Sequence, residues 1–411
     1  MNKPPDNSSA QFEPMMDTRE PIIDHKKDSR GATILQVLPA LGSGGGVERG
    51  TVEIVRAITE SGGRALVASA GGIQVHEVNR AGGIHFDLPM NSKNPIIIYK
   101  NIRRLVELIK EEKVDLVHVR SRAPAWSTFY AARQTGLPLI TTFHGTYNAE
   151  NFLKRAYNSV MTRGDRVIAI SDFIGEHVHR YYGVPASRLR IIHRGVDLFR
   201  FNRAKVSAER IVQLAGAWRI TEGHPVIMLP GRLTRWKGQV EFIEAVARLN
   251  RRDIRCLIVG SDQGRSDYRQ NLESLVKKYD LGEVVRIVDH CSDMPAAYML
   301  SDVVVSASTD PEAFGRVVIE AQALGRPVIA SDHGGARETV LKDQTGWLVP
   351  PGDVDALSLA LGKVLELDEE SRTSLSDTAI TNVVENFSRE KMCSQTLAVY
   401  DEVLHAPNLI D

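Results

Sequence analysis

The stretch PEAFGRVVIEAQALGRPVIASDHGG (residues 311–335) decides the fold, because it has the pattern of a turn, a helix, a buried strand and a glycine pair. A glycine that opens a helix lets a ligand approach the backbone, and the free N–H groups with the helix dipole favour an anion there. Glu312 precedes the turn, Gly315 lies in it, and Glu320 follows one to two turns inside the helix. The pattern predicts a nucleotide-sugar site, with phosphate at the helix start, Glu312 at sugar hydroxyls and Glu320 at the ribose. The alternative is an ordinary amphipathic helix with Glu320 on its exposed face.

This run resembles the retaining glycosyltransferases of family four, whose C-terminal domain has Glu, seven residues and Glu before such a strand and glycine pair. The chain keeps both glutamates and further residues of that pattern: Phe314, Gly315, Gly334, Gly335 and Glu338. The resemblance extends to GRLTRWKG (231–238) and GGGVERG (44–50), and covers nearly all of residues 33–405. It implies an α/β fold of GT-B type, two doubly wound Rossmann-like domains whose parallel sheets face each other across a cleft. It also implies sugar transfer with retention at the anomeric carbon, and places Phe314, Gly315 and Arg316 at the donor.

Length and composition fit a globular protein of two or three domains. The 411 residues are 43% hydrophobic and 25% charged, which is typical of soluble chains. No window approaches the roughly 18 apolar residues that span a membrane. Residues 1–30 combine charges, prolines and serines without an apolar core, so we expect a disordered tail and no signal peptide. Three cysteines without metal-like spacing fit a reducing, cytoplasmic compartment.

The net charge is zero, but its distribution is uneven. Residues 1–200 hold 27 Lys and Arg against 20 Asp and Glu, whereas residues 201–411 hold 24 against 31. A basic first half suits an anionic lipid surface or a phosphorylated acceptor. The alternative is that these charges are scattered over solvated faces. No dense basic run is interleaved with aromatic residues, so nucleic acid is not an expected partner.

Short apolar runs alternate with helical patterns along the chain, which predicts βαβ units and parallel sheets. The expected strands are TILQVLP, RALVASA, IHFDL, VDLVHV, LPLITTF and RVIAI in the first half, and PVIMLPGR, RCLIVG, VVRIV, DVVVSAS and PVIA in the second. The alternation lapses between about Leu198 and Gly223 and restarts at PVIMLPGR, where we place a domain boundary. We expect an acceptor-side domain over 31–200 and a donor domain over 201–387. A last helix within 388–411 resembles the family's helix that returns to the first domain.

The first strand ends in LPALGSGGGVER, a glycine-rich turn before a helix. The G-x-G-x-x-G register fails there, and the second strand ends without an acidic residue, so binding of NAD is disfavoured. The resemblance places Gly45 and Gly46 under the donor phosphates and beside the acceptor. The alternative is a tight turn without a ligand.

His144, in TTFHGTYN, lies just past a strand end, where side chains face the crevice of an open α/β sheet. It could bind a sugar hydroxyl or the reacting centre, and the alternative is a histidine that caps its own loop. Arg232 and Lys237 follow another strand and face one point in one turn. A nucleotide diphosphate would supply the anion that such a pair requires. The alternative is that both cations are simply exposed.

Two departures from the family pattern leave questions open. Asp289-His290-Cys291 stand where glycine is common, so the base could be that of a UDP-, GDP- or ADP-sugar. Arg194 stands where asparagine is usual, which could alter contacts in the cleft. The D-x-D sequence at Asp353 follows Pro-Pro-Gly and opens a helix, so it is better interpreted as an N-cap than as a metal motif. We therefore expect no metal and no cofactor.

The sequence thus predicts a retaining, metal-independent glycosyltransferase that acts on a saccharide or lipid-linked acceptor in cell-envelope polysaccharide or lipopolysaccharide synthesis. Peripheral attachment to the inner face of the cytoplasmic membrane is a further expectation. Two alternatives stay open. A nucleotide-sugar epimerase on the same fold would turn over donor without acceptor, and a non-catalytic binder would only bind it.

Overall fold

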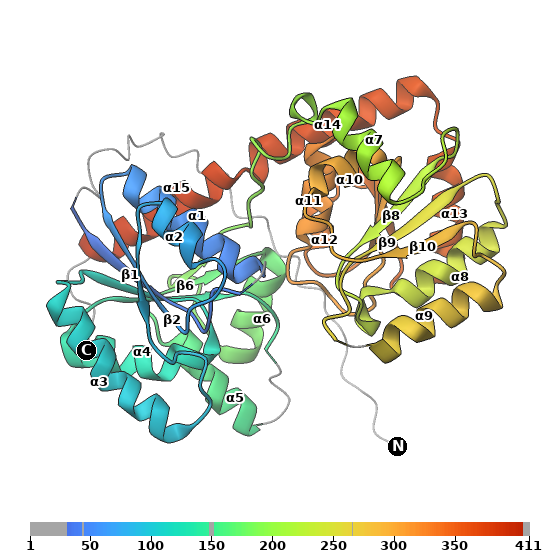
Figure 1. Cartoon of the computed structure of the whole chain (residues 1–411). Coiled ribbons are helices and arrows are strands. Elements are labelled where there is room, and N and C mark those ends of the chain that lie inside the picture. Colours follow the sequence, from blue (N-terminus) through green and yellow to red (C-terminus); the bar gives the residue numbers. More distant parts are fainter. Residues whose placement is uncertain (1–30, 43–44, 148–151, 265, 406–411) are drawn as a thin grey trace, which may run out of the picture.

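The computed structural model describes residues 31–42, 45–147, 152–264 and 266–405. The expected N-terminal tail and Gly44 of the glycine-rich turn lie outside these residues. The described chain forms two α/β domains side by side, each built on one parallel sheet (Figure 1).

The first domain has a seven-stranded sheet in the order β3-β2-β1-β4-β5-β6-β7. Its central strands are apolar and almost wholly buried, as expected when helices cover both faces of a parallel sheet. The strands are β1 (Thr33–Val37), β2 (Arg64–Ser69), β3 (Ile84–Asp87), β4 (Leu116–Val119), β5 (Leu139–Phe143), β6 (Arg166–Ala169) and β7 (Leu189–Ile191). The helices are α1 (Gly46–Glu60), α2 (Val75–Arg80), α3 (Pro95–Glu111), α4 (Arg122–Thr135), α5 (Phe152–Asn158), η1 (Ser159–Thr162) and α6 (Asp172–Tyr182).

Side chains alternate between the two faces of a strand, and β1 shows the result. Leu35 and Val37 belong to the core under α3 and α4, whereas Ile34 belongs to the core under α1 and the C-terminal helix. The first sheet therefore has a helical layer on each side.

The second domain has a six-stranded sheet in the order β10-β9-β8-β11-β12-β13. Its strands are β8 (Val226–Pro230), β9 (Arg255–Val259), β10 (Val285–Val288), β11 (Val303–Ser306), β12 (Val328–Ser331) and β13 (Gly346–Val349). Helical segments before and within it are η2 (Arg203–Lys205), α7 (Ala208–Ala217), η3 (Arg235–Lys237), α8 (Gln239–Leu249), α9 (Ser266–Lys278), α10 (Met294–Leu300), α11 (Arg316–Ala323), α12 (Ala336–Thr339), α13 (Val354–Leu365) and α14 (Glu369–Asn386). Cys256 is fully buried on β9.

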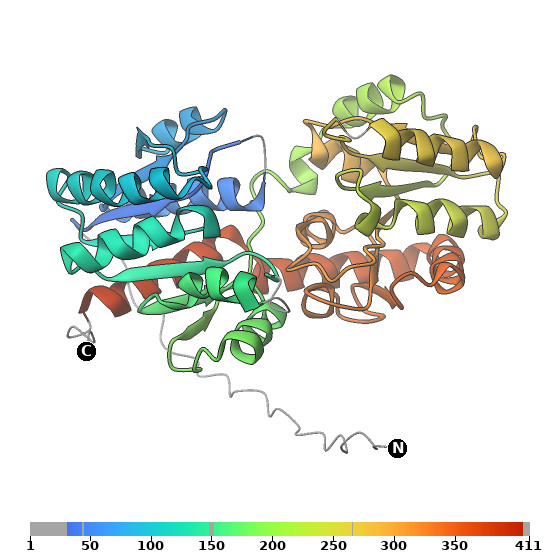
Figure 2. The ribbon, with the colours of Figure 1, turned by 90° about the horizontal axis from the view of Figure 1, so that it is seen from below.

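The chain passes between the domains twice, and the two passages are paired. Val196 N donates to Phe387 O at 2.8 Å, and Arg389 N donates to Val196 O at 2.9 Å. Arg389 Nη1 also binds Asp197 Oδ2 at 2.7 Å. The second passage leads from α14 into α15 (Arg389–His405), which runs along the first domain (Figure 2).

Helix α15 completes the first domain's core beside α1. Met392, Tyr400 and Val403 are buried there. Tyr400 and Thr142 flank the buried His118, with the Tyr400 hydroxyl 2.7 Å from its Nδ1 and the Thr142 hydroxyl 2.6 Å from its Nε2. His118 is therefore a core histidine.

The predicted fold class, two doubly wound parallel sheets of GT-B type, is confirmed. The prediction missed the edge strands β7 and β13. Among the described residues, no helix is both long and apolar enough to cross a bilayer.

Candidate active site

The loop before α11 is supported by the glycine pair Gly334-Gly335. Gly315 is the N-cap of α11 and has a φ of +82°, which glycine adopts without the strain of a side chain. Gly335 N donates to Glu312 O at 2.9 Å, and a Cβ on Gly335 would lie 2.4 Å from Phe314 Cα. A larger residue would push the loop away, so the pair positions Glu312.

Three donors of the second domain hold Glu312. Its Oε1 accepts from Lys237 Nζ at 2.8 Å, from Ser308 Oγ at 2.5 Å and from Ser306 Oγ at 3.4 Å. Burial raises the pKa of Glu312, but the Lys237 charge and these hydrogen bonds outweigh it, so the pKa lies below its ordinary value. Glu312 is therefore an ionised, immobilised carboxylate at neutral pH.

The sequence predicts that Lys237 and Arg232 face one shared anion, but the structure gives them different surroundings. Lys237 has Glu312 as its anion, and its ammonium also lies 4.5 Å from the centroid of the Trp236 ring. The guanidinium of Arg232 has no hydrogen-bond or ion-pair partner in the described part of the chain. Both cations lie on the segment that follows β8, and Lys237 is the last residue of η3.

Glu320 lies on the buried side of α11, so the alternative that places it on an exposed face is wrong. It is 7% exposed, and Tyr298 Oη donates to its Oε2 at 3.1 Å. Arg49 of α1 donates to its Oε1 at 3.2 Å, and Arg316 Nε lies 3.7 Å from the same oxygen. Glu320 therefore joins the two domains.

A hollow of about 360 Å³ adjoins this contact, between α1 and the interdomain passages. Its volume is within the range of small-molecule sites. Five arginines and three carboxylates line it, so the lining is net positive: Arg49, Arg56, Arg200, Arg316 and Arg389, with Glu53, Glu77 and Asp197. The hollow is therefore suited to an anionic ligand.

Gly45 and Gly46 lie at the start of α1, at the carboxyl edge of the first sheet. Gly45 is the N-cap, and no side chain caps the helix. A Cβ on Gly46 would meet only Arg194 Nη2, at 4.0 Å. The backbone at Gly46 is therefore approachable, and a helix start favours an anion. The Glu48 carboxylate already lies against Gly45, where a Cβ would be 2.0 Å from its Oε2.

His144 follows β5 and contacts Arg194 rather than capping its own loop. Arg194 Nη2 donates to His144 Nδ1 at 2.7 Å. A guanidinium can only donate, so the proton of the neutral ring is assigned to Nε2. That Nε2 is buried with no hydrogen-bond partner among the described residues. Burial and the charges of Arg194 and Arg120 hold the pKa of His144 well below its usual value.

The loop that carries Glu312 also touches the start of α6 in the first domain. Ser171 Oγ donates to Ala313 O at 2.6 Å. The Glu338 carboxylate of α12 accepts from the backbone N of Asp172 and of Phe173, each at 2.8 Å, so it caps α6 from the other domain. His193 Nε2 lies 2.8 Å from the same carboxylate.

Asp353 is the N-cap of α13, as predicted: its Oδ1 accepts from Ala356 N at 2.9 Å. Asp355, in the first turn, pairs with the exposed Arg248. The D-x-D sequence therefore has a structural role in the fold.

The sequence did not predict the interdomain contacts of Arg49, Ser171 and Glu338, because these contacts depend on the relative position of the two domains. Glu338 could have been selected as a candidate from the sequence, since it belongs to the family pattern described above. The assembled site offers an ionised carboxylate, two loop cations, two helix starts and a histidine that donates. This set can bind a polar, anionic ligand and stabilise charge that develops on a leaving group.

Two family descriptions match the chain: "Glycosyl transferases group 1" over residues 213–381 and "Glycosyltransferase Family 4" over residues 44–200. A solved structure titled as a glycosyltransferase from Rickettsia africae is 36% identical, with a TM-score of 0.86, and the match covers 92% of this chain and 100% of that one. The HepE protein of Anabaena, solved with UDP and glucose, has a TM-score of 0.78 at 23% identity over 89% of this chain and 98% of that one.

Sequence relatives include the GDP-mannose-dependent alpha-(1-6)-phosphatidylinositol monomannoside mannosyltransferase of Mycolicibacterium smegmatis. It is 30% identical over 278 residues, which cover 64% of this chain and 70% of the relative. WcaL of Escherichia coli, named for colanic acid biosynthesis, is 27% identical over 67% of each chain.

Proposed function

This chain belongs to the glycosyl transferases group 1 and is a glycosyltransferase of the family four type; from that premise we propose that it retains the anomeric configuration of the sugar it transfers. The donor is a nucleotide-diphosphate-sugar with uracil, guanine or adenine as its base. The acceptor is a hydroxyl of a saccharide or glycolipid. The names of WcaL and of the mycobacterial mannosyltransferase support a place in the synthesis of cell-envelope polysaccharide or lipopolysaccharide.

In the proposed reaction, the bond between the sugar C1 and the diphosphate oxygen breaks while a bond from C1 to the acceptor oxygen forms on the same face. The departing phosphate oxygen takes the acceptor's proton. Lys237, Arg232 and the start of α11 stabilise the charge on the diphosphate, and Glu312 holds sugar hydroxyls beside C1. Glu320 takes the ribose diol, and Arg49 leaves Glu320 when the ribose enters.

One observation carries this proposal: an ionised, buried Glu312 paired with Lys237 at the start of α11. A diphosphate that recruits Lys237 breaks this ion pair and frees the carboxylate for the sugar. Donor binding would therefore prepare both groups for the reaction at once.

The test is to measure transfer together with calorimetric binding of UDP, GDP and ADP. We expect Glu312→Gln to lower kcat by about 10²–10³-fold while nucleotide affinity stays equal or rises, because Lys237 is released. Lys237→Ala should lower both, with a loss of roughly 10–100-fold in nucleotide affinity, the worth of one charge-assisted hydrogen bond. Glu283→Gln, an exposed site, is the matched control.

Equal losses of nucleotide affinity and activity in Glu312→Gln would make Glu312 a structural residue. Normal nucleotide binding by Lys237→Ala would remove Lys237 from the diphosphate site. Conversion of the donor to its epimer without acceptor would identify an isomerase instead.

We propose that no metal takes part, because two cations and a helix dipole can balance the diphosphate and because Asp353 is engaged as an N-cap. Transfer should survive excess EDTA. Complete loss that Mg²⁺ or Mn²⁺ restores would return the D-x-D sequence to a catalytic role.

We also propose that the protein is cytoplasmic and that its first domain meets an anionic membrane through the layer formed by α3, α4 and α5. Large apolar side chains on this layer are exposed: Ile96, Tyr99, Tyr130, Phe152, Leu153 and Tyr157. Helices α4 and α5 are joined, since Trp126 Nε1 donates to Tyr157 O at 3.0 Å. Aromatic rings between apolar and polar surroundings are typical of membrane interfaces.

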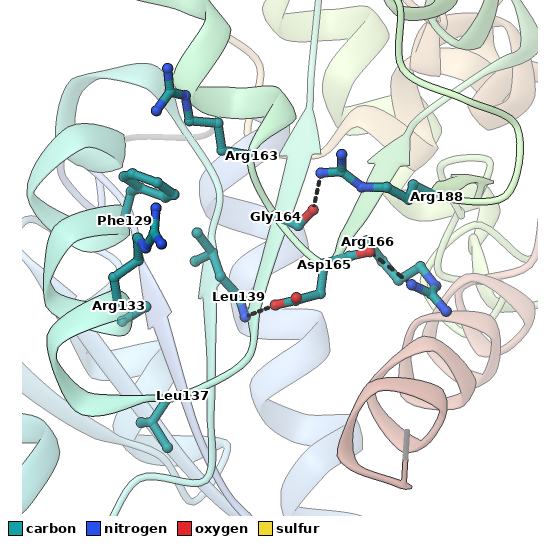
Figure 3. Close-up of a pocket in the computed structure, with 10 residues that line it drawn as sticks. Phe129, Arg133, Leu137, Leu139, Arg163, Gly164, Asp165, Arg166 and Arg188 are labelled. Carbon is teal, nitrogen blue, oxygen red and sulfur yellow. Dashed lines mark hydrogen bonds between the residues drawn. The ribbon is translucent and has the colours of Figure 1, made fainter. Parts of the chain in front are cut away.

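A hollow of about 330 Å³, lined mainly by basic side chains, lies between α4 and the amino-terminal ends of β5 and β6 (Figure 3). Arg188 and Arg166 are tied to backbone carbonyls there. Arg133 and Arg163 instead lie 5.8 and 5.3 Å from the Phe129 ring centroid, and no carboxylate in the described residues pairs with them. These two cations are the proposed contacts for lipid phosphates.

A further inference from the structure

Two arginines of the first domain are buried without a carboxylate partner. Arg120, just after β4, is 3% exposed, and Arg194, after β7, is 5% exposed. A Cβ on Gly50 of α1 would lie 2.4 Å from Arg194 Nη1 and 3.1 Å from Arg120 Nη2, so both guanidinium groups reach the same point beneath α1. Buried like charges at one place are unfavourable unless an anion lies between them.

Their described partners are neutral. Arg120 Nη1 donates to Gln36 Oε1 at 3.0 Å, and Arg194 Nη2 donates to the His144 ring. Glu53 attracts both arginines, and Glu48 attracts Arg194, from further away, but no carboxylate oxygen of the described residues lies within 4 Å of either guanidinium. Burial, and then the charge of Arg120, lower the pKa of Arg194 to about 9.

Hydrogen-bond donors without acceptors gather around the same point. Arg120 Nε and His144 Nε2 are both buried with no partner in the described structure. The start of α1 adds backbone N–H groups without a side-chain cap, although the Glu48 carboxylate of its first turn lies against Gly45. Gly46 of α1 leaves room beside Arg194, because a Cβ there would meet only Arg194 Nη2, at 4.0 Å.

We propose that Arg194 and Arg120 bind an anionic group, a phosphate or a carboxylate, that belongs to the acceptor. This inference rests on the proposed glycosyl transfer and specifies its substrate class, an acidic sugar or a phosphorylated saccharide. The donors lie at the ends of β1, β4, β5 and β7, all in the first domain, whereas the groups assigned to the donor nucleotide come mainly from the second. A fork of two guanidinium groups matches the oxygens of either anion. Arg194 stands where the family usually has asparagine, so the specificity would be particular to this chain.

The test uses inorganic phosphate and glucuronate as probes, titrated by calorimetry into protein saturated with whichever of UDP, GDP or ADP it binds. We expect the wild type to bind at least one probe, Arg194→Asn to bind it at least 10-fold more weakly, and nucleotide affinity to stay within about twofold. Arg194→Lys keeps the positive charge but lacks the bidentate guanidinium, so its affinity for the probe should lie between those of wild type and Arg194→Asn. Arg80→Gln, on the exposed end of α2, is the matched control and should behave as wild type.

Stability provides a second readout. Removing a buried cation without a carboxylate partner should raise Tm in Arg194→Asn, whereas removing a purely structural residue would lower it. The proposal is overturned if the nucleotide-saturated wild type binds neither probe, if Arg194→Asn binds them as well as wild type, or if it loses nucleotide affinity to the same degree. The last result would assign the two arginines to the donor phosphates. Failure of every nucleotide to bind would instead count against the proposed function.

Discussion

At the scale of single residues, the site is defined by which donors and acceptors are already paired. His144 Nδ1 accepts from Arg194, and its Nε2–H stays available, so the ring should act as a hydrogen-bond donor to an oxygen of the bound substrate and not as a base. Its lowered pKa keeps the ring neutral throughout the physiological range.

We therefore expect His144→Ala to lower kcat by roughly 10–100-fold, the worth of one hydrogen bond to a charged or reacting group. His144→Gln, which can still donate, should retain more activity than His144→Ala. The wild-type kcat should show no step from this group between about pH 6 and 8. A step near pH 6.5 that disappears in His144→Gln would show that the ring titrates as an ordinary histidine.

The sequence predicted the location of most of these residues but not their pairing. Each lies at a strand end or a helix start that the alternation of apolar runs reveals. That Lys237 would take Glu312 as its anion could not be predicted, because 75 residues separate them and nothing local relates their side chains. Arg194 is unusual at its position in the family pattern, but its contact with His144 could not be predicted, because it depends on the order of β5, β6 and β7 in the sheet.

At the scale of elements, the start of α6 is the clearest link between the domains. Burial lowers the pKa of His193, but hydrogen bonds and charge from Asp172 and Glu338 outweigh it and raise the pKa to about 9. The histidine is therefore charged at neutral pH and strengthens a cap that crosses from α12 to α6.

This raised pKa predicts a pH dependence of stability. The unfolded value is about 6.5, so the stabilising contribution is complete below about pH 6.5 and is lost as the pH rises through about 9. Urea unfolding at several pH values should show the advantage of wild type over His193→Gln shrinking by up to about 3 kcal/mol across this window. His405→Gln, exposed at the end of α15, is the control. A constant difference between wild type and His193→Gln would mean that His193 does not change its charge there.

Sequence patterning predicted the long helices and the buried central strands well. The edge strands β7 and β13 escaped it, because they are three and four residues long and lie next to prolines and glycines that indicate turns. Short edge strands are stabilised by pairing with the adjacent strand and by packing, so their own residue pattern predicts them poorly.

At the scale of the whole molecule, the charge asymmetry predicts salt-dependent binding of the first domain to anionic vesicles. Binding should weaken as ionic strength rises, since exposed charges are screened beyond about 8 Å at physiological salt. Reversing Arg133 and Arg163 to Glu should lower vesicle affinity by at least about 10-fold, at about 1 kcal/mol for each cation. Arg103, on α3 of the same layer, already pairs with Glu107, its Nε lying 2.7 Å from Glu107 Oε1, and should matter less.

Lys277→Glu with Lys278→Glu, on α9 of the second domain, is the matched control and should leave vesicle binding unchanged. Nucleotide affinity should stay the same in both pairs of variants. A protein that ignores anionic vesicles at low salt and glycosylates a soluble acceptor efficiently would show that the basic half is only a solvated surface.

Helix α15 has a consequence for how the protein is made. The first domain's core beside α1 is completed by residues that the ribosome delivers only after the whole second domain. At roughly 5–20 residues per second, the nascent first sheet waits on the order of 10–40 s with one apolar face uncovered. During that interval the growing chain exposes this apolar face, and a chain truncated before α15 would keep both sheets but carry a first domain prone to aggregation.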